Sequence, residues 1–135
     1  MFEKPIAILY EHPDWFAPLF DELERRGLPH QRLHIAELIH DPGVRDVPFS
    51  LVVNRVSAYP SGGTHATSGL YVSQYLAYLE SLGVRVINGH DAFLIGASKS
   101  KQLDIMAGLS LPSPRSRVFH HSSQAVDAAD GLQYP

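Results

Sequence analysis

Two lysines, Lys99 and Lys101, are the residues of this sequence best suited to bind a phosphate. They follow Ser98, whose hydroxyl can cap a helix predicted over residues 99–108. The free backbone N–H groups in the first turn of such a helix attract anions, and a lysine adds a positive charge. The helix is expected to bury Leu103 and Met106. The alternative is that both lysines are simply exposed in a first helical turn.

Arg55 and Asn88 directly follow predicted strands. Arg55 comes near the end of the β-branched run Phe49–Val56, and Asn88 follows the short run Val84–Ile87. Because the carboxyl ends of parallel strands meet at one edge of a sheet, both residues are expected there, in a substrate-binding cleft. Arg55 can bind a carboxylate through two hydrogen bonds, and its alternative role is a surface ion pair. Asn88 and Gly89 form a turn signal, since both residue types tolerate positive φ.

A glycine-rich loop between a predicted strand and a predicted helix is a third candidate for substrate binding. Ser61, Gly62 and Gly63 begin this loop, which runs to Ser68 and should lie at the same sheet edge. Its N–H groups can face an anion. The loop lacks the Gly-Lys-Ser/Thr ending of a Walker loop, and the alternative is a flexible connection.

Other catalytic and metal-binding patterns are missing from the sequence. The chain has eight histidines and no cysteine, and no His-Glu-x-x-His motif. His30 and His34 are spaced as on one helix face but fall in a segment that favours an extended strand. His120 and His121 are adjacent and would point apart on a strand. We therefore expect neither a metal site nor a catalytic residue in this chain.

Composition places the chain among globular proteins with one core. It has 135 residues, 44% of them hydrophobic, and a net charge of −3. This charge does not favour nucleic acid or an anionic membrane as a partner. No apolar run approaches the roughly 20 residues that span a bilayer, and the N-terminus lacks a signal-peptide pattern. The expected location is the cytoplasm.

Alternating strand and helix patterns predict the fold. A helix capped by Asp14 should run to Arg26, and Ser122 or Ser123 should cap a last short helix through Ala129. Strands alternating with helices imply a three-layer α/β/α fold, Rossmann-like, with a parallel sheet of four or five strands. We expect the runs at 6–10, 49–56 and 84–87 to be its central strands. The remaining predicted elements are strands at His30–Ile35 and Arg115–Phe119 and a helix at Ser68–Leu82.

These motifs, in this order, resemble the hinge segment of ATP-grasp ligases of the RimK-like and glutathione synthetase type. A second similarity is the segment Val52–Ser57, which resembles the strand and arginine of the family's first domain. The resemblance implies a pre-ATP-grasp domain over 1–111 and a hinge over 112–135 that leads to an ATP-grasp domain absent from this chain. It also implies ATP and Mg²⁺ as cofactors of the full-length parent, with Lys99 or Lys101 near ATP. The matching hinge residues are Asn88, Ser98, Lys99, Gly108, Pro112 and Pro114, with Ser116 where threonine is common.

The resemblance implies the substrate-binding lobe of a carboxylate–amine ligase, inactive as this fragment. Small-molecule carboxylate and amine substrates are then its ligands. A lobe made without its neighbour exposes apolar surface, so we also expect a homodimer. The alternatives are a free-standing flavodoxin-like or receiver-like module and a purely structural dimerisation unit. A receiver needs acidic residues where this chain has only Glu11 and Asp14, and an aspartate where it has Asn54. Glu11 is interpreted as a turn or capping residue.

Overall fold

The computed structural model describes residues 4–58 and 68–132. The chain divides into two compact units, residues 1–97 and 98–135. The first unit contains the sheet, and each unit is described by itself. This division reflects compactness, so the expected domain boundary between residues 111 and 112 stays a prediction. None of the helices in the described ranges is long and apolar enough to cross a membrane.

Four parallel strands form the sheet in the order β2-β1-β3-β4. This arrangement confirms the predicted parallel sheet, with four strands among the described residues. The prediction that Val84–Ile87 is a central strand is wrong, because β4 lies at an edge and is only partly buried. The strands are β1 (Ile6–Tyr10), β2 (His30–His34), β3 (Leu51–Asn54) and β4 (Arg85–Ile87).

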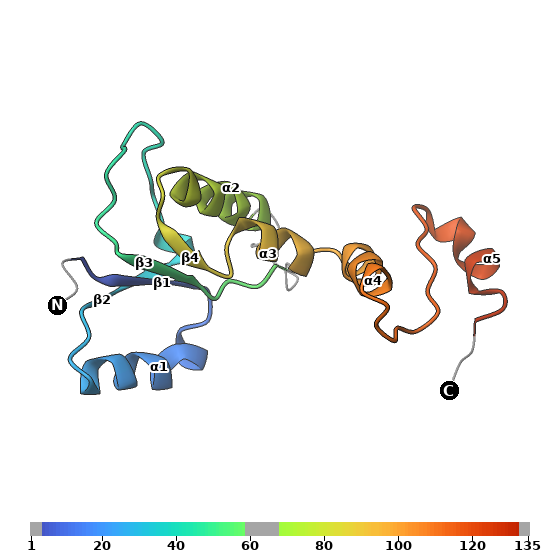
Figure 1. The fold of residues 1–135 in the computed structure, drawn as a ribbon, viewed down its shortest axis with the longest axis horizontal. Helices are drawn as coiled ribbons and strands as arrows, with labels where there is room; N and C mark the ends of the chain where they lie inside the picture. Colours follow the sequence, from blue (N-terminus) through green and yellow to red (C-terminus); the bar gives the residue numbers. More distant parts are fainter. Residues whose placement is uncertain (1–3, 59–67, 133–135) are drawn as a thin grey trace. The chain divides into compact units, whose positions relative to one another are not determined.

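Helices cover both faces of this sheet (Figure 1). Successive side chains of a strand point to opposite faces, so Ala7 and Leu9 of β1 enter one core and Ile8 enters the other. Helix α1 (Pro13–Arg25) packs on the Ile8 face, whereas α2 (Ser68–Ser81) and α3 (His90–Gly96) cover the opposite face. The predicted three-layer α/β/α fold is therefore confirmed.

Helix α1 begins earlier than predicted. Its N-cap is His12, and Asp14 lies inside the first turn instead of capping it. Pro13 explains the shift, because its fixed φ suits the first helical position and its missing N–H costs nothing there. On the inner face, Phe16, Phe20 and Leu23 are buried against the sheet. The helical spacing of these apolar residues is what predicted the element.

The turn after β4 leads into α3, a helix that the sequence patterns did not predict. Asn88 has a φ of +55°, as expected for a turn residue. Gly89 does not adopt positive φ; it is instead the N-cap of α3, with a φ of −68°. A Cβ at Gly89 would collide with the Glu80 carboxylate, which accepts a hydrogen bond from the backbone N–H of His90. A side chain at residue 89 would therefore displace the Glu80 carboxylate and cost this hydrogen bond.

The connection from β2 to β3 crosses the sheet without an α-helix. Its one regular element among the described residues is the short 3₁₀ turn η1 (Ile35–Glu37), so it lacks the hydrogen-bond ladder of an α-helix. Two tyrosines of α2 supply hydrogen bonds instead. The Tyr71 hydroxyl donates to the Leu38 carbonyl at 3.0 Å, and the Tyr78 hydroxyl donates to the Val44 carbonyl at 2.6 Å. We call residues 38–49 the crossover segment.

An aromatic cluster holds the crossover segment against α2. The His40 ring packs among three tyrosine rings with centroid separations of 4.9 to 5.6 Å. Its Nδ1 lies 3.0 Å from the Tyr71 hydroxyl oxygen. Since that hydroxyl donates to Leu38, it accepts from His40 Nδ1–H. The tyrosines are Tyr71, Tyr75 and Tyr78.

The second unit contains the helix that carries the two lysines. Helix α4 spans Lys99–Gly108, and the Ser98 hydroxyl oxygen accepts from the Lys101 backbone N–H at 3.2 Å, as a cap should. The prediction that Leu103 and Met106 are buried is wrong: both are only half-buried, and no residue of α4 is fully buried.

The rest of the second unit differs from the sequence expectations. Residues Arg115–Phe119 form no strand and are exposed throughout. The last helix is split into η2 (Ser122–Gln124) and α5 (Ala125–Ala129). His121, rather than a serine, caps η2 by accepting from the Ser123 backbone N–H. Several apolar side chains of this unit are exposed: Leu109, Leu111, Val118, Phe119 and Val126. Self-association through such residues stays a prediction.

Candidate functional site

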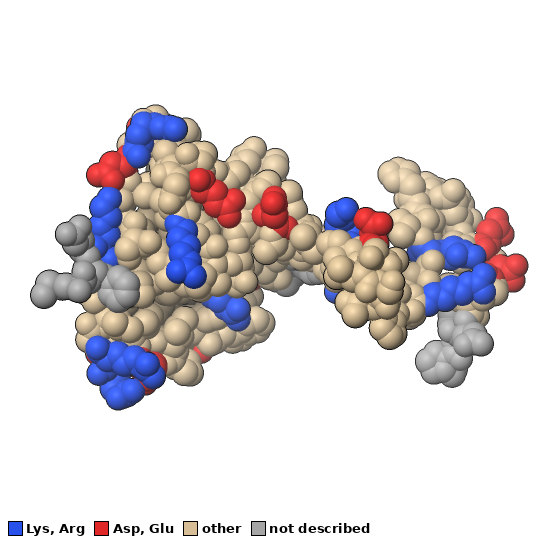
Figure 2. All heavy atoms as spheres, in the orientation of Figure 1, with Lys and Arg blue, Asp and Glu red and all other residues tan. Residues whose placement is uncertain are grey.

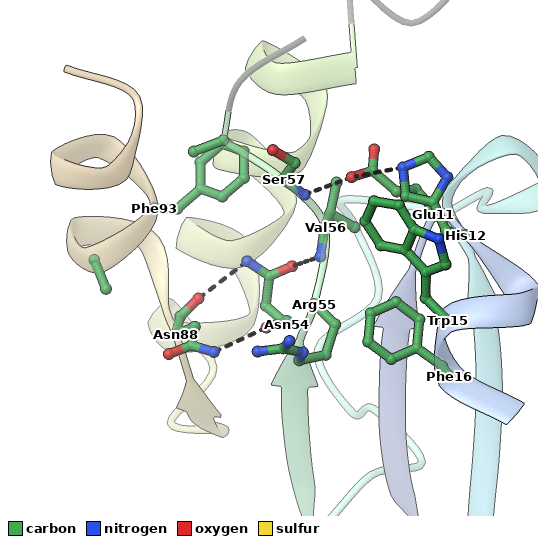
Figure 3. A pocket seen from close by; sticks show the side chains of 12 residues that line it. Glu11, His12, Trp15, Phe16, Asn54, Arg55, Val56, Ser57, Asn88 and Phe93 are labelled. Atoms are coloured by element: carbon green, nitrogen blue, oxygen red, sulfur yellow. Dashed lines mark hydrogen bonds and ion pairs between the residues drawn. The ribbon is translucent and has the colours of Figure 1, made fainter. Parts of the chain in front are cut away.

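A cavity of about 360 Å³ lies at the carboxyl edge of the sheet (Figure 3). Its walls come from the ends of β1, β3 and β4 and from helices α1 and α3. Glu11, His12 and Trp15 lie on one side, and Asn88 and Phe93 lie on the other. The remaining lining residues are Phe16, Asn54, Arg55, Val56, Ser57, Ala58 and Ala92.

Two asparagines hold one wall of the cavity together. Asn54 Nδ2 donates to the Asn88 carbonyl, and Asn88 Nδ2 donates to the Asn54 carbonyl, each at 3.1 Å. Asn54 is only 3% exposed, and its Oδ1 also accepts from the Val56 backbone N–H. The pair therefore fixes the ends of β3 and β4 to each other. Asn88 lies at the edge where it was predicted, although its amide nitrogen braces this wall; a role in substrate binding stays a prediction.

Arg55 is exposed at the cavity, beside Phe16. Its guanidinium carbon lies 5.4 Å from the centre of the Phe16 ring, a cation–π arrangement. Within residues 4–58 and 68–132, no carboxylate lies within ion-pair distance of Arg55, so the surface ion pair considered above is not formed there. Its backbone N–H donates to Leu9, which continues the pairing of β1 with β3. Arg55 and Asn88 thus share the predicted edge and one cavity.

Glu11 connects the end of β1 to the segment after β3. Its Oε1 accepts from the Ser57 backbone N–H at 2.8 Å and lies 3.7 Å from His12 Nε2. The side chain is only 13% exposed. Sequence reasoning treated Glu11 as a local turn residue and missed its place in the cavity. The available signal was its position directly after a parallel strand, which is the same signal that identified Arg55.

Trp15 forms an exposed aromatic wall of the cavity. The residue is 73% exposed, and the His12 ring packs 4.3 Å from its own ring. Trp15 does not belong to the buried stripe of α1, which Phe16, Phe20 and Leu23 form. Sequence reasoning followed that stripe and therefore passed over the tryptophan. A large aromatic residue outside the buried face of an amphipathic helix was the signal.

The two lysines belong to the second unit. Lys99 Nζ donates to Gln102 Oε1 at 3.1 Å, and Lys101 Nζ pairs with Asp104 Oδ2 at 3.0 Å. Their role at a phosphate stays a prediction. Ser61, Gly62 and Gly63 lie outside the described residues. On the face of the first unit visible in Figure 2, basic and acidic side chains are interspersed.

The histidines of the sheet bond to backbone groups. His30 Nδ1 lies 3.1 Å from the Leu28 carbonyl, and His34 Nε2 lies 3.1 Å from the Glu11 carbonyl. In the described part of the chain, no three His, Asp or Glu side chains come together to hold a metal ion. These two imidazoles therefore connect strand β2 to neighbouring turns.

Comparison with known proteins identifies a similar fold. No protein-family model and no curated protein sequence matches the chain. Among solved structures, the fold is similar to that of a RimK domain ATP-grasp protein from Sphaerobacter thermophilus, with a TM-score of 0.73. The match covers 97% of this chain at 20% identity, and the chain spans 47% of that protein. At this identity the likeness establishes the fold, which is the one that the hinge and strand motifs predicted.

Proposed function

We propose that this chain is the N-terminal, substrate-binding lobe of an ATP-dependent carboxylate–amine ligase. The observation that carries the proposal is the fold shared with a RimK domain ATP-grasp protein over nearly the whole chain. A second support is the cavity, which lies where parallel α/β folds bind ligands and includes the exposed Arg55, whose guanidinium has no carboxylate partner among residues 4–58 and 68–132.

In this class of reaction, ATP phosphorylates a carboxylate and an amine then attacks the acyl phosphate. The C–N bond of the amide forms as the bond from the acyl carbon to the phosphate oxygen breaks, and inorganic phosphate leaves. Arg55 would hold a carboxylate of one substrate, with two N–H groups donating to its two oxygens. Asn54 and Asn88 would keep that wall of the cavity fixed while the substrate binds.

Phosphoryl transfer also requires charge neutralisation, which Mg²⁺ supplies in enzymes that use ATP. We assign no magnesium ligand to the described residues, because no three acidic or histidine side chains gather there. Lys99 and Lys101, at the start of α4, have the charge and the neighbouring N–H groups that suit a phosphate. The ligands for the metal would come from the ATP-grasp domain of the parent.

The test of the ligase proposal is ADP release by the full-length gene product. ADP should form only when a carboxylate and an amine substrate are both supplied, and the 135-residue chain alone should release none. The proposal would be contradicted if ADP release did not depend on either substrate, or if the full-length product released no ADP at all. A chain that binds no substrate and only self-associates would favour a dimerisation unit.

We predict that Lys99→Ala weakens ATP use by about 10- to 100-fold, equivalent to one lost charge-assisted contact of about 1.5–3 kcal/mol. Lys101→Ala should do less, because Lys99, directly after the capping Ser98, is the lysine that matches the Ser-Lys pair of the family. The measurement is steady-state kinetics of the full-length product at varied ATP. Lys4→Ala is the matched control, since Lys4 pairs with Asp46 far from α4 in the sequence. An effect confined to Lys101 would move the role to that residue, and two unchanged variants would remove it from α4.

A further inference from the structure

We propose that Glu11 and Trp15 form a subsite for the ammonium group of an amino compound, opposite the carboxylate-binding Arg55 in the same cavity. The inference rests on the proposed function and specifies how the amine substrate is held. It also predicts the orientation of the ligand in the cavity. The amine end of the ligand lies at the end of β1, and its acid end lies at the end of β3.

The Glu11 carboxylate has capacity for a further donor. Within the described residues, the Ser57 N–H donates to Oε1, and His12 Nε2 lies 3.7 Å from the same oxygen. No buried side-chain oxygen of the described residues lacks a partner, so Oε2 is open to solvent at the cavity and a ligand there would replace water. An ammonium group carries three N–H donors and a positive charge, so it matches Oε2 in both respects. The Ser57 bond fixes the carboxylate before any ligand binds.

Trp15 adds the surface that an organic cation prefers. Its ring is on the same side of the cavity as Glu11, and the residue is 73% exposed. The face of an indole attracts cations more strongly than any other side-chain ring does. A ligand that covers Trp15 also removes apolar surface from water. Glu11 and Trp15 together therefore favour an amine over a neutral group of similar size.

The spacing of the strands limits the length of the ligand. Glu11 follows β1 and Arg55 follows β3, and these two strands are hydrogen-bonded neighbours. Neighbouring strands lie about 4.8 Å apart, so the two opposite charges start from nearby points on the backbone. One small molecule can then contact both. The ligand class is a short amino acid whose ammonium and carboxylate are separated by a few bonds.

The single tryptophan of the chain makes the test direct. Trp15 is the only tryptophan, so tryptophan fluorescence reports on the cavity itself. The chain is titrated separately with propylamine, propionate and β-alanine, which share a three-carbon length. β-Alanine should bind at least about tenfold more tightly than either singly charged probe, because it engages both ends of the cavity. Absence of a fluorescence response to all three probes would overturn the proposal.

Two variants separate the two ends of the cavity. Glu11→Gln keeps an oxygen for the Ser57 N–H but removes the negative charge, so propylamine affinity should fall at least about tenfold while propionate affinity stays. Arg55→Gln should show the reverse pattern. Glu37→Gln, which changes an exposed carboxylate outside the cavity, is the matched control and should bind every probe normally. Urea midpoints of all variants confirm that each is folded.

Unchanged propylamine and β-alanine affinities in Glu11→Gln would overturn the ammonium subsite. That failure is distinguishable from failure of the ligase proposal, because probe binding needs no ATP and ADP release is measured independently. A chain that binds β-alanine as predicted while the full-length product releases no ADP would keep the subsite and refute the ligase. ADP release by the full-length product, together with unchanged propylamine and β-alanine affinities in Glu11→Gln, would keep the ligase proposal and refute the subsite.

Discussion

Asn88 meets two requirements in one residue. Its backbone lies in the left-handed region, and its side chain donates across to the end of β3. Asparagine is among the few residues other than glycine that adopt this conformation readily. Unlike glycine, it also carries a side-chain amide. The residue was predictable as a turn from its place before Gly89. Its bond to Asn54 was not, because that bond depends on which strands become neighbours.

Replacing Asn88 with glycine and with alanine separates these requirements. Asn88→Gly keeps the backbone conformation and loses the hydrogen bond, so we expect a loss of about 0.5–1.5 kcal/mol in the free energy of unfolding. Asn88→Ala loses the bond and also strains the backbone, which adds about 1–2 kcal/mol. Urea denaturation of the two variants measures both effects. Equal stabilities of the glycine and alanine variants would show that the conformation carries no cost.

Tyr75 gives the fold a dependence on alkaline pH. Burial, assisted by the nearby Tyr71 and Tyr78, raises the pKa of Tyr75 to about 12 from a usual value of 10.0. Between these values the unfolded chain loses the phenol proton and the folded chain keeps it, so unfolding is favoured as pH rises. We predict that stability falls from pH 10 to pH 12 and that Tyr75→Phe reduces the fall. Urea midpoints of the wild type and of Tyr75→Phe across that range measure this effect. An equal fall of the midpoint in both proteins would contradict the prediction.

The cavity shows how far single residues could be predicted. Arg55 and Asn88 were found because they directly follow strands of a parallel sheet, and that rule depends only on the chain order. Glu11 obeys the same rule but was assigned a local role, since a carboxylate next to a proline-containing turn is common as a cap. Trp15 was missed because helical periodicity selects buried residues, and this one is exposed.

At the scale of elements, the crossover segment depends on α2 for its hydrogen bonds. Tyr78→Phe removes a hydroxyl that bonds to the Val44 carbonyl at 2.6 Å and to the Asp41 carbonyl at 3.4 Å. We predict a loss of about 0.5–1.5 kcal/mol, with faster amide hydrogen exchange over the crossover segment than in wild type. The ring of Tyr78 remains, so packing against His40 is retained. Exchange that accelerates equally in β1 would indicate a global effect instead.

Strong periodicity made most elements predictable, and its absence explains the errors. Strands β1 and β3 and helices α1, α2 and α4 were found at or close to their observed bounds. The short helix α3 was missed because it has only one buried residue, Phe93, and therefore no apolar repeat. The run at 115–119 has β-branched and aromatic residues but pairs with no strand among the described residues of its unit. A strand requires a partner, which a local pattern cannot supply.

At the scale of the molecule, the layers were predictable and the strand order was not. Alternating strands and helices require a parallel sheet with helices on both faces. The position of each strand within the sheet depends instead on the path of the connection that leads into it. The sequence places Val84–Ile87 last among the sheet strands, and the chain adds it beside β3 at an open edge. Short apolar runs are similar at an edge and in the centre of a sheet, so the pattern at 84–87 does not distinguish an edge strand from a central one.

The tyrosine bonds to the crossover segment also set an order of events during synthesis. Strands β1, β2 and β3 leave the ribosome before Tyr71 and Tyr78 are exposed to the rest of the chain. Until then, the carbonyl groups of Leu38 and Val44 lack the tyrosine donors that they have in the folded chain. We therefore expect the nascent sheet to fold cooperatively only after α2 has emerged from the ribosome. An arrest-peptide assay should record the pulling force of this folding step at that chain length. A comparable force before Tyr71 emerges would show that the first three strands fold without these bonds.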